Sequence, residues 1–248
     1  MQVYEAPLRD MKFVLHELHN DDGFGNLEAL EEFTPDLVDA VLEEAAKVAQ
    51  EVLLPLNRSG DIEGCTVENG GVRTPKGFKE AYDLFREGGW CALASDPDWG
   101  GQGLPEQVNK MTEEMICSAN LSFSLYPGLT HGGTTAMEAY ASDELKQAYL
   151  PKMVSGEWSG TMCLTEAHCG TDLGMLRTKA VPQDDGSYKL TGGKIFISAG
   201  EHDLTENIIH LVLARMPDAP AGVKGISLFL VPKYLPKDDG TPGEANGV

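Results

Sequence analysis

Apolar residues recur at helical spacing through the first part of the chain. Thr34-Pro35-Asp36 combines a hydroxyl that can cap a helix, a proline suited to the first helical position and an acid in the first turn. Apolar residues then follow three and four positions apart as far as Leu53, which predicts an amphipathic helix that ends near Pro55. The same spacing predicts further helices at Pro75–Glu87, 106–125 and 131–150, with turns at 60–77 and a loop at 88–105.

The pattern changes near residue 158 to short, partly alternating, β-rich runs separated by glycine and aspartate turns. The runs are Met162–Thr165, Met175–Val181, Tyr188–Ile197, Ile208–Ala214 and Ile226–Val231. Helices first and strands afterwards predict an α+β protein with an all-helical N-terminal domain and an antiparallel β domain. We expect a lead segment of one or two short helices at 1–34, a helical domain at 35–157 and a β domain at 158–248. The β domain is expected to be incomplete, because the chain stops one polar loop after a strand.

Composition narrows the class of protein. With 42% hydrophobic and 23% charged residues, the 248-residue chain has the usage of a globular protein. The net charge of −20 argues against binding to nucleic acid or to anionic membranes, and no apolar run approaches the length of a membrane span. Five cysteines without a C-x-x-C spacing predict reduced thiols and a cytoplasmic protein.

Two short stretches carry candidate chemistry. In Thr161–Asp172, a strand delivers Thr165 and is followed by the turn Gly170-Thr171-Asp172, whose backbone amides could bind a diphosphate. Lys194–Gly200 is predicted to be a strand, on which Phe196 and Ser198 would share one face and meet the same ligand. Taken singly, each stretch is also compatible with ordinary core packing and a capped turn.

Together, the two stretches resemble the flavin-binding signatures of the acyl-CoA dehydrogenase family, T-E-P-x-x-G-S-D and K-x-W-I-T-N-G. Leu150–Glu157 is similar to the Y-L-P-x-x-x-S-G-E approach to the first signature, and Gly88–Gly103 to the family's glycine-rich loop. The four motifs occur in the family's order across residues 35 to 232. The sequence of Cys169–Ala180 is most similar to that of the larger bacterial members related to 3-methylmercaptopropionyl-CoA dehydrogenase.

The resemblance implies an FAD site. Met162 and Leu164 would lie beside the flavin, and Thr165 would hydrogen-bond its pyrimidine end. Gly170 and Thr171 would bind the diphosphate, and Thr171 would also lie near the pantetheine of the thioester substrate. Phe196 stands where the family usually has tryptophan, and Ser198 replaces the threonine that hydrogen-bonds the hydride-accepting nitrogen. The residues Ala167, His168 and Cys169 depart from P-x-x, which should loosen the turn without removing a ligand.

The implied activity is flavin-dependent α,β-dehydrogenation of an acyl-CoA thioester to the enoyl-CoA, in fatty acid metabolism. The family's base is a glutamate of the C-terminal helical domain, so no acid of this chain, Glu166 included, is assigned as catalytic. The chain alone is therefore expected to be inactive. The implied partners are an electron-transfer flavoprotein or similar acceptor and further copies of the chain in a homodimer or homotetramer. An acyl-CoA oxidase and a non-enzymatic helical binding module with a β domain remain the alternatives.

The other candidate residues favour structural roles. His131 is predicted at a helix start, in a capping or packing role. His202 and His210 have no metal-ligating partners at helical or strand spacing. Cys163 and Cys169 are spaced for neither a zinc knuckle nor a redox pair. We expect no metal site.

Overall fold

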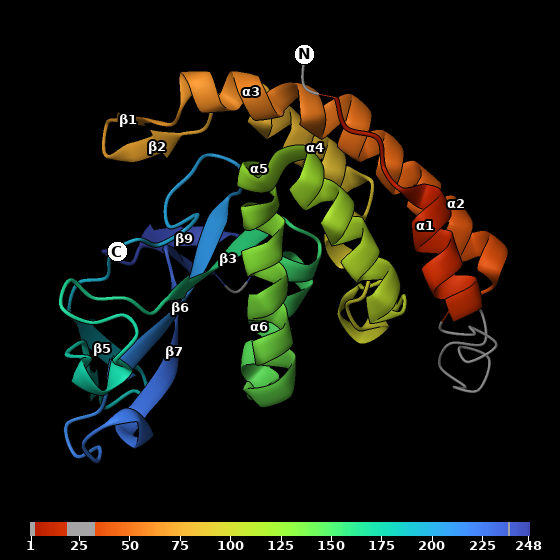
Figure 1. Cartoon of the computed structure of the whole chain (residues 1–248). Coiled ribbons are helices and arrows are strands. Elements are labelled where there is room, and N and C mark those ends of the chain that lie inside the picture. The colour runs from red at the N-terminus through yellow and green to blue at the C-terminus, as the bar shows by residue number, and fades with distance from the viewer. Residues whose placement is uncertain (1–2, 19–32, 238) are drawn as a thin grey trace.

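The computed structural model describes residues 3–18, 33–237 and 239–248, which form a helical half beside a β half (Figure 1). The helical half begins with α1 (Leu8–Phe13) and the π-helical turn Val14–Leu18, followed by α2 (Pro35–Lys47). The Thr34 hydroxyl accepts a hydrogen bond from the Leu37 amide at 3.3 Å, so the predicted N-cap is confirmed. The part of the predicted lead segment at residues 19–32 lies outside the described residues.

The first long helix runs further than predicted. α2 continues through the π-helical segment Val48–Leu53 into α3 (Leu54–Glu63). Pro55 does not end the helix, because it lies in the first turn of α3, where the α-helical pattern needs no amide hydrogen. The chain leaves the helix only at Gly64, whose φ of 70° suits a glycine.

A small hairpin stands where only turns were predicted. It consists of β1 (Thr66–Glu68) and β2 (Gly71–Arg73), paired antiparallel. Asn69 and Gly70 both have positive φ, 52° and 81°, as a two-residue type I′ turn requires. Strands of three residues are too short to leave an alternating pattern in the sequence.

α4 (Phe78–Glu87) lies within its predicted range and is followed by the 3-10 turns Trp90–Ala92 and Pro97–Trp99. α5 (Glu106–Tyr140) merges the next two predicted helices, but it is bent at Asn120, where φ is −155° and ψ is 88°. We call the segments before and after Asn120 its two arms. α6 (Asp143–Val154) begins at Ser142, whose hydroxyl caps the Leu145 amide. The break between helices therefore lies at 141–142 and not at 126–130.

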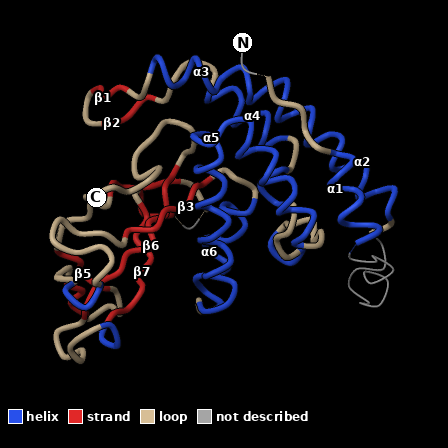
Figure 2. The backbone as a smooth tube through the Cα atoms, in the orientation of Figure 1, coloured by secondary structure: helices blue, strands red, loops and turns tan. Residues whose placement is uncertain are grey.

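β6 (Asn207–Arg215) is the centre of the β half (Figure 2). Along one edge it pairs in parallel with β3 (Trp158–Cys163) and then, at Arg215, with β4 (Lys179–Pro182). Two further pairings are antiparallel, between β6 and β7 (Ile226–Pro232) and between β4 and β5 (Tyr188–Thr191). A separate pair is formed by β8 (Tyr234–Pro236) and β9 (Pro242–Ala245).

The α+β class and the order of its parts are confirmed, but the sheet is mixed and not wholly antiparallel as expected. The difference arises in the connections. The segments 164–178 and 192–206 are long enough to carry the chain back before the next strand begins, whereas only short turns enforce antiparallel neighbours.

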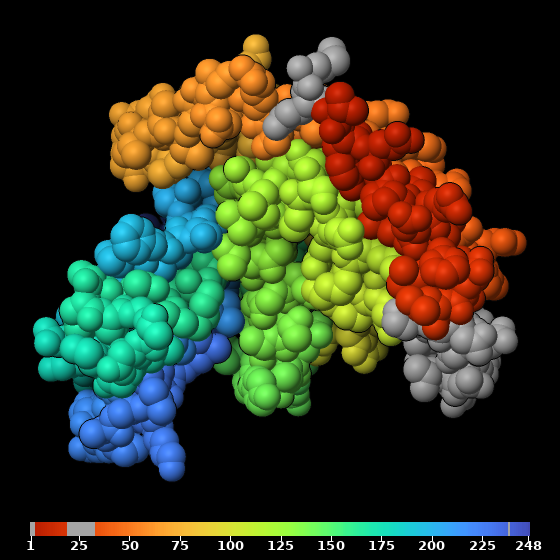
Figure 3. All heavy atoms as spheres, in the orientation of Figure 1, coloured from red at the N-terminus to blue at the C-terminus, as the bar shows by residue number. Residues whose placement is uncertain are grey.

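The two halves are joined by a close contact between α5 and β3. The Gly160 amide donates to the Thr130 hydroxyl at 2.9 Å, and a Cβ added at Gly133 would lie 4.0 Å from the Gly160 Cα. A small core flanks this contact, made of Met137, Tyr149, Leu150, Met153, Trp158 and Ile209. Figure 3 shows the β half and the second arm of α5 in direct surface contact. None of the described helices is long and apolar enough to cross a membrane.

Candidate functional site

The first candidate stretch leaves the sheet at the end of β3. Cys163 is buried, whereas the neighbouring Met162 is 38% exposed on the opposite face of the strand. A compact turn follows, in which Glu166 and Cys169 exchange two backbone hydrogen bonds of 2.8 and 3.1 Å. The chain then folds back so that Gly170 contacts the Thr165 side chain. A Cβ added at Gly170 would lie 3.3 Å from the Thr165 Cγ2. The turn thus brings Thr165 and Gly170 together.

The second candidate stretch is not a strand, which corrects the prediction for Lys194–Gly200. β5 ends at Thr191 because its partner β4 begins at Lys179, so the residues beyond have no strand to pair with. Phe196 and Ala199 have positive φ, 56° and 55°, which is strained backbone for residues with a Cβ. Phe196 is 89% exposed and Ser198 is exposed, but they do not share a strand face.

The two stretches nevertheless meet, although 30 residues separate them. The Ile195 amide donates to the Thr165 carbonyl oxygen at 3.0 Å. The Lys194 ammonium donates to the Leu164 carbonyl oxygen at 3.1 Å and to a Glu166 carboxylate oxygen at 3.0 Å. Thr165 of one stretch and Phe196 of the other are therefore held by neighbouring contacts.

Glu166 is a buried structural carboxylate. Its side chain is 4% exposed and accepts hydrogen bonds from the Arg177 amide, the Thr178 amide, the Thr178 hydroxyl and Lys194. Burial by itself would raise the pKa of Glu166, but the Thr178 hydroxyl, the two amides and Lys194 outweigh it and lower the pKa to about 2. A carboxylate with so low a pKa binds a proton too weakly to act as a general base. This agrees with the expectation that Glu166 is not the catalytic base.

One cluster of the described residues has the composition of a metal site, namely Glu166, His168 and Cys169. A cation there would compete for Glu166 with Lys194, and the His168 Nε2 already lies 3.0 Å from the Met175 carbonyl oxygen. We do not assign a metal to it.

The buried histidines belong to hydrogen-bonded packing. His202 Nδ1 accepts from the Leu204 amide at 3.1 Å, so Nε2 carries the proton and donates to the Ser159 hydroxyl at 3.0 Å. Ser159 therefore has no base to activate it as a nucleophile. Burial lowers the pKa of His202 to about 4 and also lowers that of His210, whose Nδ1 lies 2.8 Å from the Thr161 hydroxyl oxygen.

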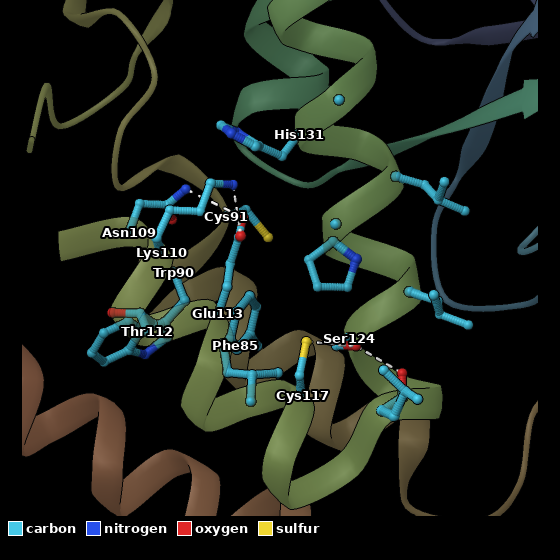
Figure 4. Close-up of a pocket in the computed structure, with 17 residues that line it drawn as sticks. Phe85, Trp90, Cys91, Asn109, Lys110, Thr112, Glu113, Cys117, Ser124 and His131 are labelled. Carbon is cyan, nitrogen blue, oxygen red and sulfur yellow. Dashed lines mark hydrogen bonds and ion pairs between the residues drawn. The ribbon is translucent and has the colours of Figure 1, made fainter. Parts of the chain in front are cut away.

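A pocket of about 380 Å³ lies between the two arms of α5 (Figure 4). Its apolar walls include Phe85, Trp90, Ile116, Leu121 and Leu125, and its polar residues include Asn109, Lys110, Glu113 and His131. His131 is thus a pocket residue inside α5, not at a helix start as predicted. Sequence periodicity could not reveal this pocket, because the apolar spacing continues across the bend at Asn120 that separates its walls.

Asn120 is fully buried and makes two hydrogen bonds in the bend. Its Oδ1 accepts from the Phe123 amide at 3.0 Å, as an N-cap does for the second arm, and its Nδ2 donates to the Leu53 carbonyl oxygen at 3.1 Å. Ser124 and Cys117 then bridge the arms with a 3.4 Å contact (Figure 4). The bend is therefore built by specific side chains.

The two stretches have groups that fit a flavin nucleotide. Within the described residues, the hydrogen bonds of the first turn run through Glu166, Cys169 and Asp172, which leaves the amides of Gly170 and Thr171 free for an anion. Phe196 offers an exposed ring and Ser198 an exposed hydroxyl. These donors and this ring match the needs of a diphosphate and of a planar heterocycle.

Comparisons with known proteins agree with the motifs. Residues 36–157 match the family "Acyl-CoA dehydrogenase, N-terminal domain", and residues 161–243 match "Acyl-CoA dehydrogenase, middle domain". The chain is 47% identical over 243 residues to 3-methylmercaptopropionyl-CoA dehydrogenase of Ruegeria pomeroyi, covering 98% of this chain and 41% of that protein. It is 40% identical over 250 residues to a butyryl-CoA dehydrogenase of Syntrophomonas wolfei, covering 99% of this chain and 41% of that protein.

A solved structure shares the fold. It is an acyl-CoA dehydrogenase complexed with FAD from Bacillus anthracis, with a TM-score of 0.65 and 20% identity, covering 82% of this chain and 32% of that one. The chain spans about 41% of the length of the curated relatives above.

Proposed function

Since the chain belongs to the acyl-CoA dehydrogenase family, we propose that it forms the helical and β portions of an FAD-dependent enzyme that converts an acyl-CoA thioester to the enoyl-CoA. The observation that carries the proposal is the junction of the two signatures, where the Ile195 amide meets the Thr165 carbonyl oxygen. Two motifs with separate flavin contacts can serve one ring only if they lie side by side.

The proposed FAD contacts keep the roles implied by the motifs. Met162, Leu164 and Thr165 would line the flavin at the end of β3, and Gly170 and Thr171 would bind the diphosphate through their amides. Phe196 would cover the ring edge, and Ser198 would donate to the nitrogen that accepts the hydride. The bound FAD would supply the acceptor for hydride from the substrate's β-carbon. Met162 and Phe196 are both exposed, so their side chains are accessible to a ligand, as these roles require.

We propose that the pocket between the arms of α5 receives the acyl group. Its lining residue Gly132 precedes Gly133, which packs against Gly160 of β3, two residues before Met162. Apolar walls suit a hydrocarbon or thioether chain, and Thr171 would lie along the pantetheine. A carboxylate must remove the α-proton, and Glu166 is excluded from this role by its four hydrogen bonds and low pKa.

The partners and the setting are also proposals. All five cysteines are free thiols, which suits a reducing compartment such as the cytoplasm. The reduced flavin would pass its electrons to an electron-transfer flavoprotein or a similar acceptor, and the protein would assemble as a homodimer or homotetramer.

The test uses the complete polypeptide that carries this sequence. Purified with excess FAD, it should show flavin absorbance that bleaches when acyl-CoA is added without oxygen. A panel of short, long and thioether-containing acyl-CoA substrates, compared by kcat/KM, would identify the substrate. Hydrogen peroxide formed in step with substrate loss would assign an oxidase instead. Protein that takes up no FAD would contradict the proposal and favour a binding module.

The same assay on residues 1–248 alone should show no bleaching by substrate. The proposed base is a glutamate outside this chain, so substrate-dependent reduction at full-length rates would contradict its placement.

A further inference from the structure

The segment that carries Phe196 and Ser198 has little regular structure to hold it. Residues 192–206 connect β5 to β6 without a helix or a strand. Near Ser198, this segment is joined to the end of β3 by the Ile195 amide and by both hydrogen bonds of the Lys194 ammonium. On the other side of Ser198, the segment is held by the ion pair between Glu201 and Lys233 and by the hydrogen bond between His202 and Ser159. The three hydrogen bonds of Ile195 and Lys194 are therefore the ones that join it to the first signature.

The carboxylate that accepts from Lys194 is itself held by three further hydrogen bonds. Glu166 follows Thr165 directly, and its carboxylate is fixed by the Arg177 and Thr178 amides at 2.8 and 2.9 Å and by the Thr178 hydroxyl. Those donors lie at the entrance to β4, which belongs to the sheet. Lys194 is only 10% exposed, so solvent weakens its ion pair with Glu166 little.

We propose that the Glu166–Lys194 pair is a positioning device that holds Ser198 and Phe196 at a set place relative to Thr165, and through them sets the affinity and reduction potential of the flavin. The inference rests on the proposed function, since it concerns the same FAD site. Neither residue touches the reacting atoms. The pair acts by joining the two signatures, four residues before Ser198 and one residue after Thr165.

The two members of the pair differ in what their removal does. Without Glu166, two amides and a hydroxyl at the start of β4 lose their acceptor, so the fold itself is weakened. Without Lys194, Glu166 keeps three donors and β3 remains paired with β6. Replacement of Lys194 therefore disturbs the fold less than replacement of Glu166 does, and Lys194→Met is the more informative variant.

The experiment compares Lys194→Met, Lys194→Arg and a matched control, Lys152→Met, in the complete polypeptide. Lys152 pairs with Glu157 before β3, away from both signatures. The measurements are the dissociation constant of FAD, the flavin absorption spectrum and reduction potential, and the thermal midpoint of the FAD-free protein.

We expect Lys194→Met to weaken FAD binding by about tenfold or more, as the loss of charged hydrogen bonds predicts, and to shift the spectrum and potential. Its FAD-free form should melt below the wild type, because Glu166 stays buried without its cation, so the affinities are compared at a temperature well below both midpoints. Lys194→Arg should keep most of the affinity, because a guanidinium can donate to both the Leu164 carbonyl oxygen and the Glu166 carboxylate oxygen. Lys152→Met should bind FAD normally.

The inference is overturned if Lys194→Met binds FAD with wild-type affinity and potential, if Lys152→Met loses as much affinity, or if the affinity of Lys194→Met is lost only at temperatures at which its FAD-free form unfolds. Wild-type protein that binds no FAD would instead refute the proposed function, and this inference with it. The two failures are therefore distinguishable.

Discussion

The carboxamide of Asn120 donates to the carbonyl oxygen of Leu53 across 67 residues, at 3.1 Å. This bond attaches the bend of α5 to the end of the π-helical segment that precedes α3. Because the same side chain caps the second arm through the Phe123 amide, one buried residue both breaks α5 and anchors the break. The bend places the two arms of α5 on either side of the pocket.

Replacement of Asn120 by alanine should lower the free energy of unfolding by about 2–4 kcal/mol, because two buried hydrogen bonds are lost and their partners stay buried. Asn120→Asp should cost at least as much, because a buried carboxylate oxygen would face the Leu53 carbonyl oxygen in place of the donating amide. Urea unfolding of the three proteins measures the difference. An alanine variant as stable as the wild type would show that the bend does not depend on this side chain.

The pH dependence of stability should report His202. Burial lowers its pKa from 6.5 to about 4, so between these values the unfolded chain binds a proton that the folded protein does not. The stabilisation is complete above pH 6.5 and is lost as the pH falls toward 4, to a total of about 3 kcal/mol. His202→Gln should flatten the slope of unfolding free energy between pH 6.5 and 4.5. If His202→Gln leaves this slope unchanged, the folded protein does not lower the pKa of His202, and the prediction is wrong.

Gly170 and Gly193 form a matched pair for the flavin site. A Cβ at Gly170 would press on Thr165 at 3.3 Å, whereas a Cβ at Gly193 would meet nothing within 4 Å. Gly170→Ala should therefore strain the turn and displace the amides that would bind the diphosphate. We expect FAD to bind about threefold to thirtyfold more weakly, which corresponds to the free energy of one strained contact. Gly193→Ala should bind FAD as the wild type does. Titration of FAD into both variants is the measurement, and equal affinities would contradict the contact.

Ser198→Ala tests the proposed hydrogen bond to the flavin. Loss of one hydrogen bond should shift the flavin reduction potential or slow its reduction by acyl-CoA, by an amount on the order of 1–3 kcal/mol. Ser187→Ala, in the turn between β4 and β5, is the control. Stopped-flow reduction under anaerobic conditions measures the rate, and an unchanged rate and spectrum would refute the role of Ser198.

Local chemistry was readable along the chain. Thr34 caps a helix as its sequence context predicted, because an N-cap involves only residues a few positions apart. The two signatures were also recognisable as short strings, and the family match extends over both domains that the resemblance covered. Helices before strands were predicted in the right order for the same reason, since periodicity is a local property.

Long-range contacts decided the rest. Lys194–Gly200 has the composition of a strand, yet it has no partner because β4 starts too late, and no local pattern records where a partner ends. The parallel pairing of β3 with β6 joins residues about 50 positions apart, and the bend at Asn120 needs an acceptor 67 positions away. The motifs could thus be identified from the sequence, but their arrangement around Glu166 and Lys194 depends on hydrogen bonds between distant segments, which only the folded chain brings within reach.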